Sequence, residues 1–269
     1  MTQFYTDPKM SFAPIAIVGR SCVLPKAFSP EELWARIQRQ ESLITEVAAD
    51  RWRVDHDDIT SSASEATPDR TWSVKGGYVE GFEEHFTPEN LSLSEEQKDD
   101  ILGLDPLFHW VLHTVEQALN DGARIQGQRT GLIMGNLSFP TASMSQLSEE
   151  TWFPEFSTKV SPGNRFMSGY PALLMKKIFS LDGPVFALDS ACASALYAIR
   201  LACDALHDGS ADLMLAGAVN RADDLFIHVG FSALQALSKT GQSQPFSADA
   251  DGLLPAEGAS FVLLKRLLL

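Results

Sequence analysis

One cysteine stands where the sequence could carry nucleophilic chemistry. Cys192 follows an apolar run, residues 183–189, and opens an alanine-rich segment, residues 191–209, whose apolar periodicity is helical. In the first turn of a helix, unpaired backbone N–H groups and the helix dipole favour a thiolate. The N–H of Cys192 could also face an oxyanion, although the G-x-S-x-G turn is absent. Position alone leaves a nucleophile and a buried packing residue evenly matched, because free cysteine is commonly buried.

The other two cysteines, Cys22 and Cys203, have no visible partner and are predicted to be packing residues. On one straight helix the sulfurs of Cys192 and Cys203 would stand roughly 16 Å apart, which is too far for a disulfide. Three cysteines without paired spacing fit a reducing compartment, so we expect a cytoplasmic protein.

The remaining chemistry-bearing residues make weaker candidates. His109 and His113 have the i, i+4 spacing of paired metal ligands, but no glutamate or third ligand accompanies them, so helix packing is favoured. No glycine-rich phosphate loop follows a strand, and we expect no metal and no directly bound cofactor. Asp249, Asp251 and Glu257 lack the EF-hand pattern, and turn chemistry explains them better.

Composition limits the partners. The 269 residues are 45% hydrophobic, which is enough for a large core, and 35 acidic against 21 basic residues give a formal charge of -14. An acidic chain of this kind argues against nucleic acid or an anionic membrane as the main partner. The first twenty residues show neither a signal-peptide pattern nor a membrane span.

Short apolar runs alternate with helical patterns, which predicts an α/β protein with a layered, mixed and mainly parallel sheet. Residues 50–100 are polar and are expected to form surface excursions. The predicted strands are residues 14–19, 130–135, 183–189, 211–220 and 258–267, and the predicted helices are residues 29–40, 105–122, 163–179 and 191–209.

Three segments carry a family resemblance. The sequences "GPVFALDSACASALYAIRLACDALHDGSADLMLAGAVN" and "FSALQALSKTGQSQPFSADADGLLPAEGASFVLLKRL" resemble β-ketoacyl synthases, in particular the ketosynthases of type I polyketide and polyunsaturated fatty acid synthases. "PIAIVGRSCVLPKAFSPEELWARI" is similar to their opening segment. The resemblance implies a thiolase-like fold, of which residues 1–269 would form the N-terminal half with its decorations, without the C-terminal portion that carries the catalytic histidines.

The resemblance also implies roles. Asp189 to Ser194 match the family segment D-[ST]-A-C-[AS]-S, so Cys192 would accept an acyl chain as a thioester, with its backbone N–H as an oxyanion donor. The donor would be an acyl carrier protein bearing phosphopantetheine, and decarboxylative Claisen condensation with a malonyl unit would follow. Neighbouring synthase modules and a second copy, in a homodimer of the full-length protein, are the other expected partners.

The condensing histidines are the missing part. The family places them in H-G-T-G-T and G-H-like segments beyond the strand at residues 258–267, and neither is present. His207 and His228 match neither segment, while His56 and His85 are too scattered to interpret. We therefore expect acyl acceptance without independent condensation. We also expect an apolar face left uncovered, through which the chain self-associates, aggregates or needs a partner chain. The alternatives left open are a non-catalytic scaffold or dimerisation piece and, less favoured, thiolase-like or hydrolase chemistry at Cys192.

Overall fold

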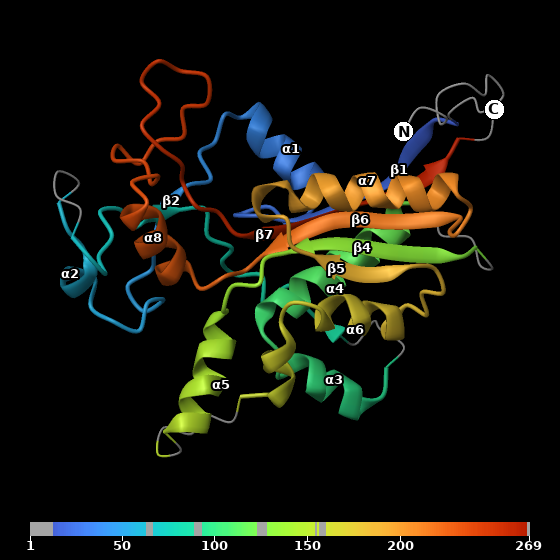
Figure 1. Ribbon diagram of the computed structural model, residues 1–269, viewed down its shortest axis with the longest axis horizontal. Coiled ribbons are helices and arrows are strands. Elements are labelled where there is room, and N and C mark those ends of the chain that lie inside the picture. The colour runs from blue at the N-terminus through green and yellow to red at the C-terminus, as the bar shows by residue number, and fades with distance from the viewer. Residues whose placement is uncertain are drawn as a thin grey trace, which may run out of the picture.

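A five-stranded mixed sheet forms the centre of the molecule (Figure 1). The computed structural model describes residues 13–62, 67–88, 93–122, 128–153, 155 and 160–267. The strands lie in the order β1 (Ile15–Val23), β7 (Gly258–Arg266), β6 (Leu213–Asn220), β4 (Thr130–Asn136) and β5 (Val185–Leu188). β4 pairs in parallel with β5 and β6, whereas β7 pairs antiparallel with β6 and β1.

The predicted α/β class and mixed sheet are confirmed, but parallel pairing does not predominate among the described strands. In the five-stranded sheet, two of the four pairings are antiparallel. The parallel strands β4, β5 and β6 are joined by helical crossovers, while β7 returns after α8 (Asp224–Ala233) and a long loop. A buried apolar run does not show strand direction, so its pairing could not be read from the sequence.

Helices cover both faces of the sheet. α4 (Pro106–Asp121) and α6 (Tyr170–Ile178) pack on one face, and α7 (Ser194–His207) packs on the other (Figure 1). Successive strand residues point to opposite faces, so Leu132 joins the hydrophobic cluster beneath α4 and Ile133 joins the cluster beneath α7. Because both faces are covered, β4 is buried along its whole length, as the apolar run in the sequence predicts.

Capping residues set where the helices begin. Ser29 caps α1 (Pro30–Gln38) by accepting the N–H of Glu32 at 3.2 Å, with proline at the first helical position. The Glu32 carboxylate reaches back to accept the N–H of Phe28, the residue before the cap, at 2.7 Å. Asp105 caps α4 in the same manner. The local signals at these two helices are therefore confirmed.

Two predicted helices are subdivided. Residues 163–179 form a 3-10 helix, η3 (Pro162–Phe166), and then α6, because Gly169 and Pro171 begin a new helix between them. Residues 191–209 form a 3-10 turn, η4 (Ala191–Ala193), and then α7. The elements that the sequence did not indicate are α2 (His56–Ile59), α3 (Glu95–Leu102), α5 (Ala142–Trp152), α8 and the short pair β2 (Thr45–Glu46) and β3 (Lys75–Gly76). Within the described part of the chain, no helix has the length and apolarity needed to cross a bilayer.

Candidate active site at Cys192

Cys192 lies in η4, directly beyond the carboxyl end of β5 and before the first turn of α7. Its side chain is exposed, so the interpretation as a buried packing residue is wrong. The carboxyl ends of the parallel strands β4 and β6 meet at the same edge of the sheet, where α/β proteins commonly bind ligands. The fold thus places an accessible thiol at the edge of the sheet where ligands commonly bind.

The turn that carries Cys192 has an uncommon backbone. Ala191 has φ of +49°, in the left-handed region that residues with a Cβ rarely adopt. The Asp189 carboxylate accepts the N–H of Ala191 at 2.9 Å and that of Ser138 at 3.0 Å. The Ser194 hydroxyl accepts the N–H of Ser190 at 2.8 Å and donates to the carbonyl of Ala191 at 2.7 Å. Side chains on both sides of Cys192 therefore hold this turn.

Cys192 opens into a largely apolar cavity of about 440 Å³. The loop after β4, the end of β6, α8 and the segment that leads into β7 supply its walls. Its larger side chains are Leu24, Leu137, Phe139, Ile227 and Phe231, with Asn136, Asn220 and Glu257 as polar members. Phe139 and Phe226 contact each other with ring centroids 5.5 Å apart, which ties the loop after β4 to α8. A space of this size and lining suits an apolar chain attached to the sulfur.

The backbone around Cys192 offers electrostatic stabilisation. The N–H groups of Ala191 and Ala193 are already bonded, to Asp189 and to the carbonyl of Ser190. Among the described residues, no hydrogen bond engages the N–H of Cys192. This free N–H and the N-terminal end of α7 can stabilise both a thiolate and the oxyanion of a tetrahedral intermediate. The arrangement is suited to forming a thioester on Cys192.

The other cysteines pack as predicted. Cys22 is buried on β1, and burial raises the pKa of its thiol to about 11, so it is inert near neutral pH. Cys203 is half-buried against the cluster beneath α7, and burial also raises the pKa of its thiol. Neither of them lines the cavity at Cys192.

The histidines pack or bind backbone groups. His109 stacks on Phe86 at 4.5 Å and His113 contacts Phe82 edge-on at 5.2 Å, which confirms the prediction of helix packing. His228 is buried, and its ring bonds to the Tyr78 hydroxyl and the carbonyl of Ser73, both at 3.0 Å. Burial lowers the pKa of His109, His113 and His228, so these rings are neutral near pH 7.

His56 lies against Trp52 with ring centroids 5.0 Å apart, and His85 contacts Phe28 at 4.9 Å. His207 bonds to the carbonyl of Ala13 at 2.9 Å. The described residues that line the cavity at Cys192 include no histidine.

The acidic stretch before β7 divides into two roles. Asp251 accepts the Ser238 hydroxyl at 2.6 Å and the N–H of Thr240 at 2.7 Å, which confirms the prediction of turn chemistry. For Glu257 that prediction is wrong, because its buried carboxylate forms an ion pair with Arg51. Nη2 of Arg51 donates to Oε1 of Glu257 at 2.7 Å and to Oε2 at 2.8 Å. Arg51 lies about two hundred positions away, so no local pattern could show this ion pair. Asp249 stays in the turn, where its N–H donates to Ser247 at 3.1 Å.

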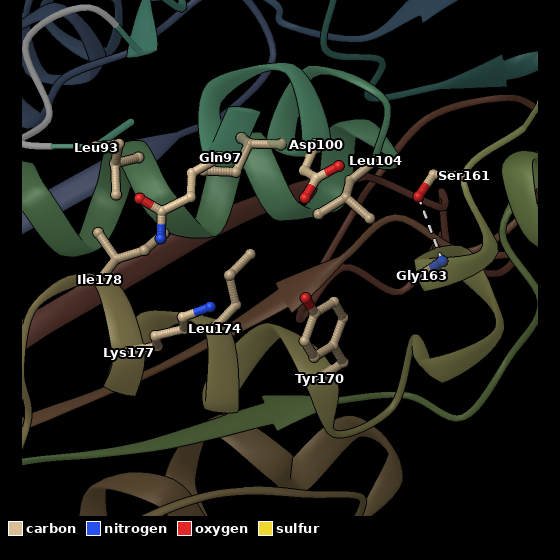
Figure 2. A pocket seen from close by; sticks show the side chains of 11 residues that line it. Leu93, Gln97, Asp100, Leu104, Ser161, Gly163, Tyr170, Leu174, Lys177 and Ile178 are labelled. Carbon is tan, nitrogen blue, oxygen red and sulfur yellow. Dashed lines mark hydrogen bonds between the residues drawn. The ribbon is translucent and has the colours of Figure 1, made fainter. Parts of the chain in front are cut away.

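A second pocket, of about 230 Å³, lies between α3 and α6, on the face of the sheet away from α7 (Figure 2). Asp100 and Tyr170 face each other across it, and Lys177 extends into it from α6 (Figure 2). Its lining includes charged and apolar side chains but neither cysteine nor histidine. Among the described residues it therefore lacks a thiol such as that of Cys192.

Reasoning from the sequence missed the hydrogen-bonding roles of Asp189 and Ser194, although both lie in the motif around Cys192. Their spacing from Ala191, two and three residues, is that of side chains that bond to nearby backbone groups. That spacing was the available signal. Ser138 and Phe139 carried no such signal, because the fold alone brings the loop after β4 to this turn.

Comparison with known proteins places these features in context. Residues 13–268 match the family model described as beta-ketoacyl synthase, N-terminal domain. The chain is 33% identical over 266 residues to a mycocerosic acid synthase-like polyketide synthase of Mycobacterium tuberculosis, covering 97% of this chain and 12% of that protein. The chain thus spans about an eighth of the length of this relative.

Solved structures give the same result. A structure titled PfaC keto synthase-chain length factor has a TM-score of 0.83 and 34% identity, over 94% of this chain and 29% of that one. The oxazolomycin ketosynthase domain of Streptomyces albus has a TM-score of 0.77 and 29% identity, over 94% of this chain and 43% of that one.

Proposed function

Because the chain belongs to the β-ketoacyl synthase family, as its N-terminal domain, we propose that Cys192 accepts an acyl group from an acyl carrier protein. The observation that carries the proposal is the exposed thiol of Cys192 on a held turn at the mouth of an apolar cavity. The carrier would present the acyl group on phosphopantetheine, so the chain itself binds no cofactor. The few polar groups and the apolar walls of the cavity suit a thioester followed by a hydrocarbon chain.

The first half-reaction follows from the geometry. The Cys192 thiolate attacks the carbonyl carbon of the acyl thioester, and a carbon–sulfur bond forms while the carbonyl electrons move to oxygen. The N–H of Cys192 stabilises that oxyanion. When the carbonyl re-forms, the bond to the pantetheine sulfur breaks, and the pantetheine thiolate leaves and takes up a proton. The acyl chain then remains on Cys192.

The second half-reaction needs more than this site provides. Loss of carbon dioxide from a malonyl thioester would give an enolate whose carbon attacks the acyl carbonyl and releases the Cys192 thiolate. The family resemblance assigns two histidines to this step, and the described lining of the cavity contains none. We propose that the chain supplies the acyl-accepting part of a ketosynthase and that condensation requires residues from a further polypeptide segment.

Two exposed apolar surfaces support assembly with other protein. Strand β5 is the last strand of the sheet, and Phe186 on it is 40% exposed. On α7, Leu196 is 71% exposed and Tyr197 is 54% exposed. We propose that one of these surfaces meets a second copy in a homodimer and the other meets the rest of the ketosynthase. Neighbouring synthase modules are further proposed partners, because the curated relative is a polyketide synthase about eight times longer.

These same surfaces favour the second candidate function, a scaffold or dimerisation piece without catalysis. The cytoplasm is the compartment we propose, because Cys22, Cys192 and Cys203 are all free thiols and a reducing compartment preserves them.

Intact-mass measurement tests the proposal. The unchanged chain and Cys192→Ala are each incubated with an acyl-pantetheine thioester and with an acylated carrier protein. We expect one acyl increment on the unchanged chain and none on the variant. Cys203→Ala is the matched control, because it removes a thiol on α7, the helix that follows the Cys192 turn, and should keep the increment. An increment on neither protein would favour the scaffold.

A further inference from the structure

The turn at Cys192 holds a conformation that its own residues do not favour. Ala191 at φ of +49° carries a Cβ in the left-handed region, where only glycine is readily accommodated. A non-glycine residue stays there only when surrounding contacts hold it, and such residues cluster at functional sites. Two side chains, those of Asp189 and Ser194, bond within this turn, and Asp189 also bonds to the loop after β4.

Both oxygens of the Asp189 carboxylate are engaged. Oδ1 of Asp189 accepts the N–H of Ala191 at 2.9 Å, within the turn, and Oδ2 accepts the N–H of Ser138 at 3.0 Å, from the loop after β4. We propose that Asp189 is a positioning residue that clamps the Cys192 turn to this loop and thereby sets the direction of the Cys192 sulfur and N–H toward the thioester. The effect on acyl transfer to Cys192 rests on the proposed function, whereas the role of Asp189 in holding the turn to the loop does not.

The clamp reaches the cavity wall as well as the nucleophile. The loop that Asp189 holds continues into Phe139, which lines the cavity beside Cys192. Beyond it, the carbonyl of Pro140 accepts the N–H of Asp223 at 2.8 Å, at the start of α8. One carboxylate therefore fixes the distance between the sulfur and the wall against which the acyl chain would lie.

Asp189 does not act as a general base. The N–H of Ala191 in the first place and that of Ser138 in the second hold the pKa of its carboxyl below the ordinary value. A weakly basic carboxylate whose two oxygens already accept backbone bonds has little capacity to take a proton from Cys192. Positioning is the role that this geometry leaves to it.

The test compares Asp189→Ala and Asp189→Asn with Asp208→Asn in the 269-residue chain. Asp208 is the matched control, because its carboxylate also accepts a backbone N–H, that of Ser210 at 2.8 Å, at the opposite end of α7. Amide hydrogen exchange should show lost protection at Ala191 and Ser138 in Asp189→Ala. In Asp189→Asn the protection should be lost mainly at Ser138, if the amide keeps its oxygen toward Ala191. Asp208→Asn should leave both amides protected.

Acylation supplies the functional readout. We expect the rate of acyl transfer to Cys192 to fall about 10–100-fold in Asp189→Ala, the scale of a misplacement near 1 Å. Alkylation of Cys192 by iodoacetamide, which needs no oxyanion donor, should change much less. Ala191→Gly added to Asp189→Ala should recover part of the lost rate, because glycine adopts the left-handed conformation without a clamp.

The outcomes separate the two proposals. Equal protection of Ala191 and Ser138 in the unchanged chain and Asp189→Ala would overturn the clamp, whatever the acylation result. Parallel losses of alkylation and acylation, without recovery by Ala191→Gly, would show a general disturbance and overturn the positioning role. No acyl increment on the unchanged chain would overturn the proposed function and, with it, the catalytic part of this inference.

Discussion

Gly135 is a position where one added carbon should directly disturb the candidate site at Cys192. A Cβ there would lie 2.6 Å from the Ser194 Cβ and 2.9 Å from the Ser194 carbonyl carbon. Ordinary contacts begin at 3.4 Å, so Gly135→Ala forces the start of α7 to move by roughly 0.8 Å. Overpacking of this kind costs about 1–3 kcal/mol. For a chain of this length the melting temperature should fall by about 2–6 °C.

The displacement falls on the turn that holds Cys192, so acyl transfer should suffer more than folding. We expect the acylation rate at 25 °C, where the variant stays folded, to drop about tenfold or more. Calorimetry gives the melting temperature and intact-mass kinetics give the rate. Gly103→Ala is the matched control, because the nearest atoms to its added Cβ lie 3.6 Å away. Equal melting temperatures and equal rates for the two variants would refute the reasoning.

The remaining predictions concern the rest of the molecule. Glu257→Ala should lower the free energy of urea unfolding by up to about 3–5 kcal/mol, because it removes the buried carboxylate that pairs with Arg51 and Arg221 and leaves Arg51 with Asp224 alone. Glu31→Ala, which removes an exposed ion pair, should cost less than about 1 kcal/mol, and similar losses in the two variants would contradict this reasoning. The Ser238 hydroxyl and the N–H of Thr240 lower the pKa of Asp251, so Asp251 stabilises the fold above the ordinary aspartate pKa and loses that effect as pH falls through the lowered value. The difference in unfolding free energy between the unchanged chain and Asp251→Asn should therefore shrink from pH 7 to pH 3, and a constant difference would count against it. Phe186→Asp should reduce self-association in sedimentation velocity, and unchanged association would exclude the outer edge of β5 from the contact.

The sequence predicted most of the regular structure, because local signals carry it. Ser29 and Asp105 mark the starts of α1 and α4, and the apolar runs of β4 and β6 mark buried strands. Helical crossovers indicate that the strands they join run parallel, but no such signal gives the direction of β7. Its antiparallel pairing with β6 was therefore not predicted. Helices α5 and α8 were missed because no stripe of apolar residues distinguishes them; α5 buries none of its residues.

The sequence could single out Cys192 as the candidate nucleophile but could not show its surroundings. Motif and helix position indicated Cys192, and the structure adds its exposure. The clamp to Ser138 and the ion pair between Arg51 and Glu257 join segments 51 and 206 residues apart, respectively. Contacts over such separations depend on tertiary folding, which neither periodicity nor a short motif encodes.

The pairing of β1 with β7 has a consequence for biosynthesis. The Ser21 hydroxyl donates to the carbonyl of Phe261, 240 positions later, and Ser260 donates back to the carbonyl of Ser21. At about 5–20 residues per second, β1 would wait roughly 10–50 s on the ribosome before its partner strand is translated. During that interval β6 also lacks β7, so its edge stays open. The nascent chain therefore completes its sheet late, and its yield should depend on translation speed and on chaperones that shield that edge.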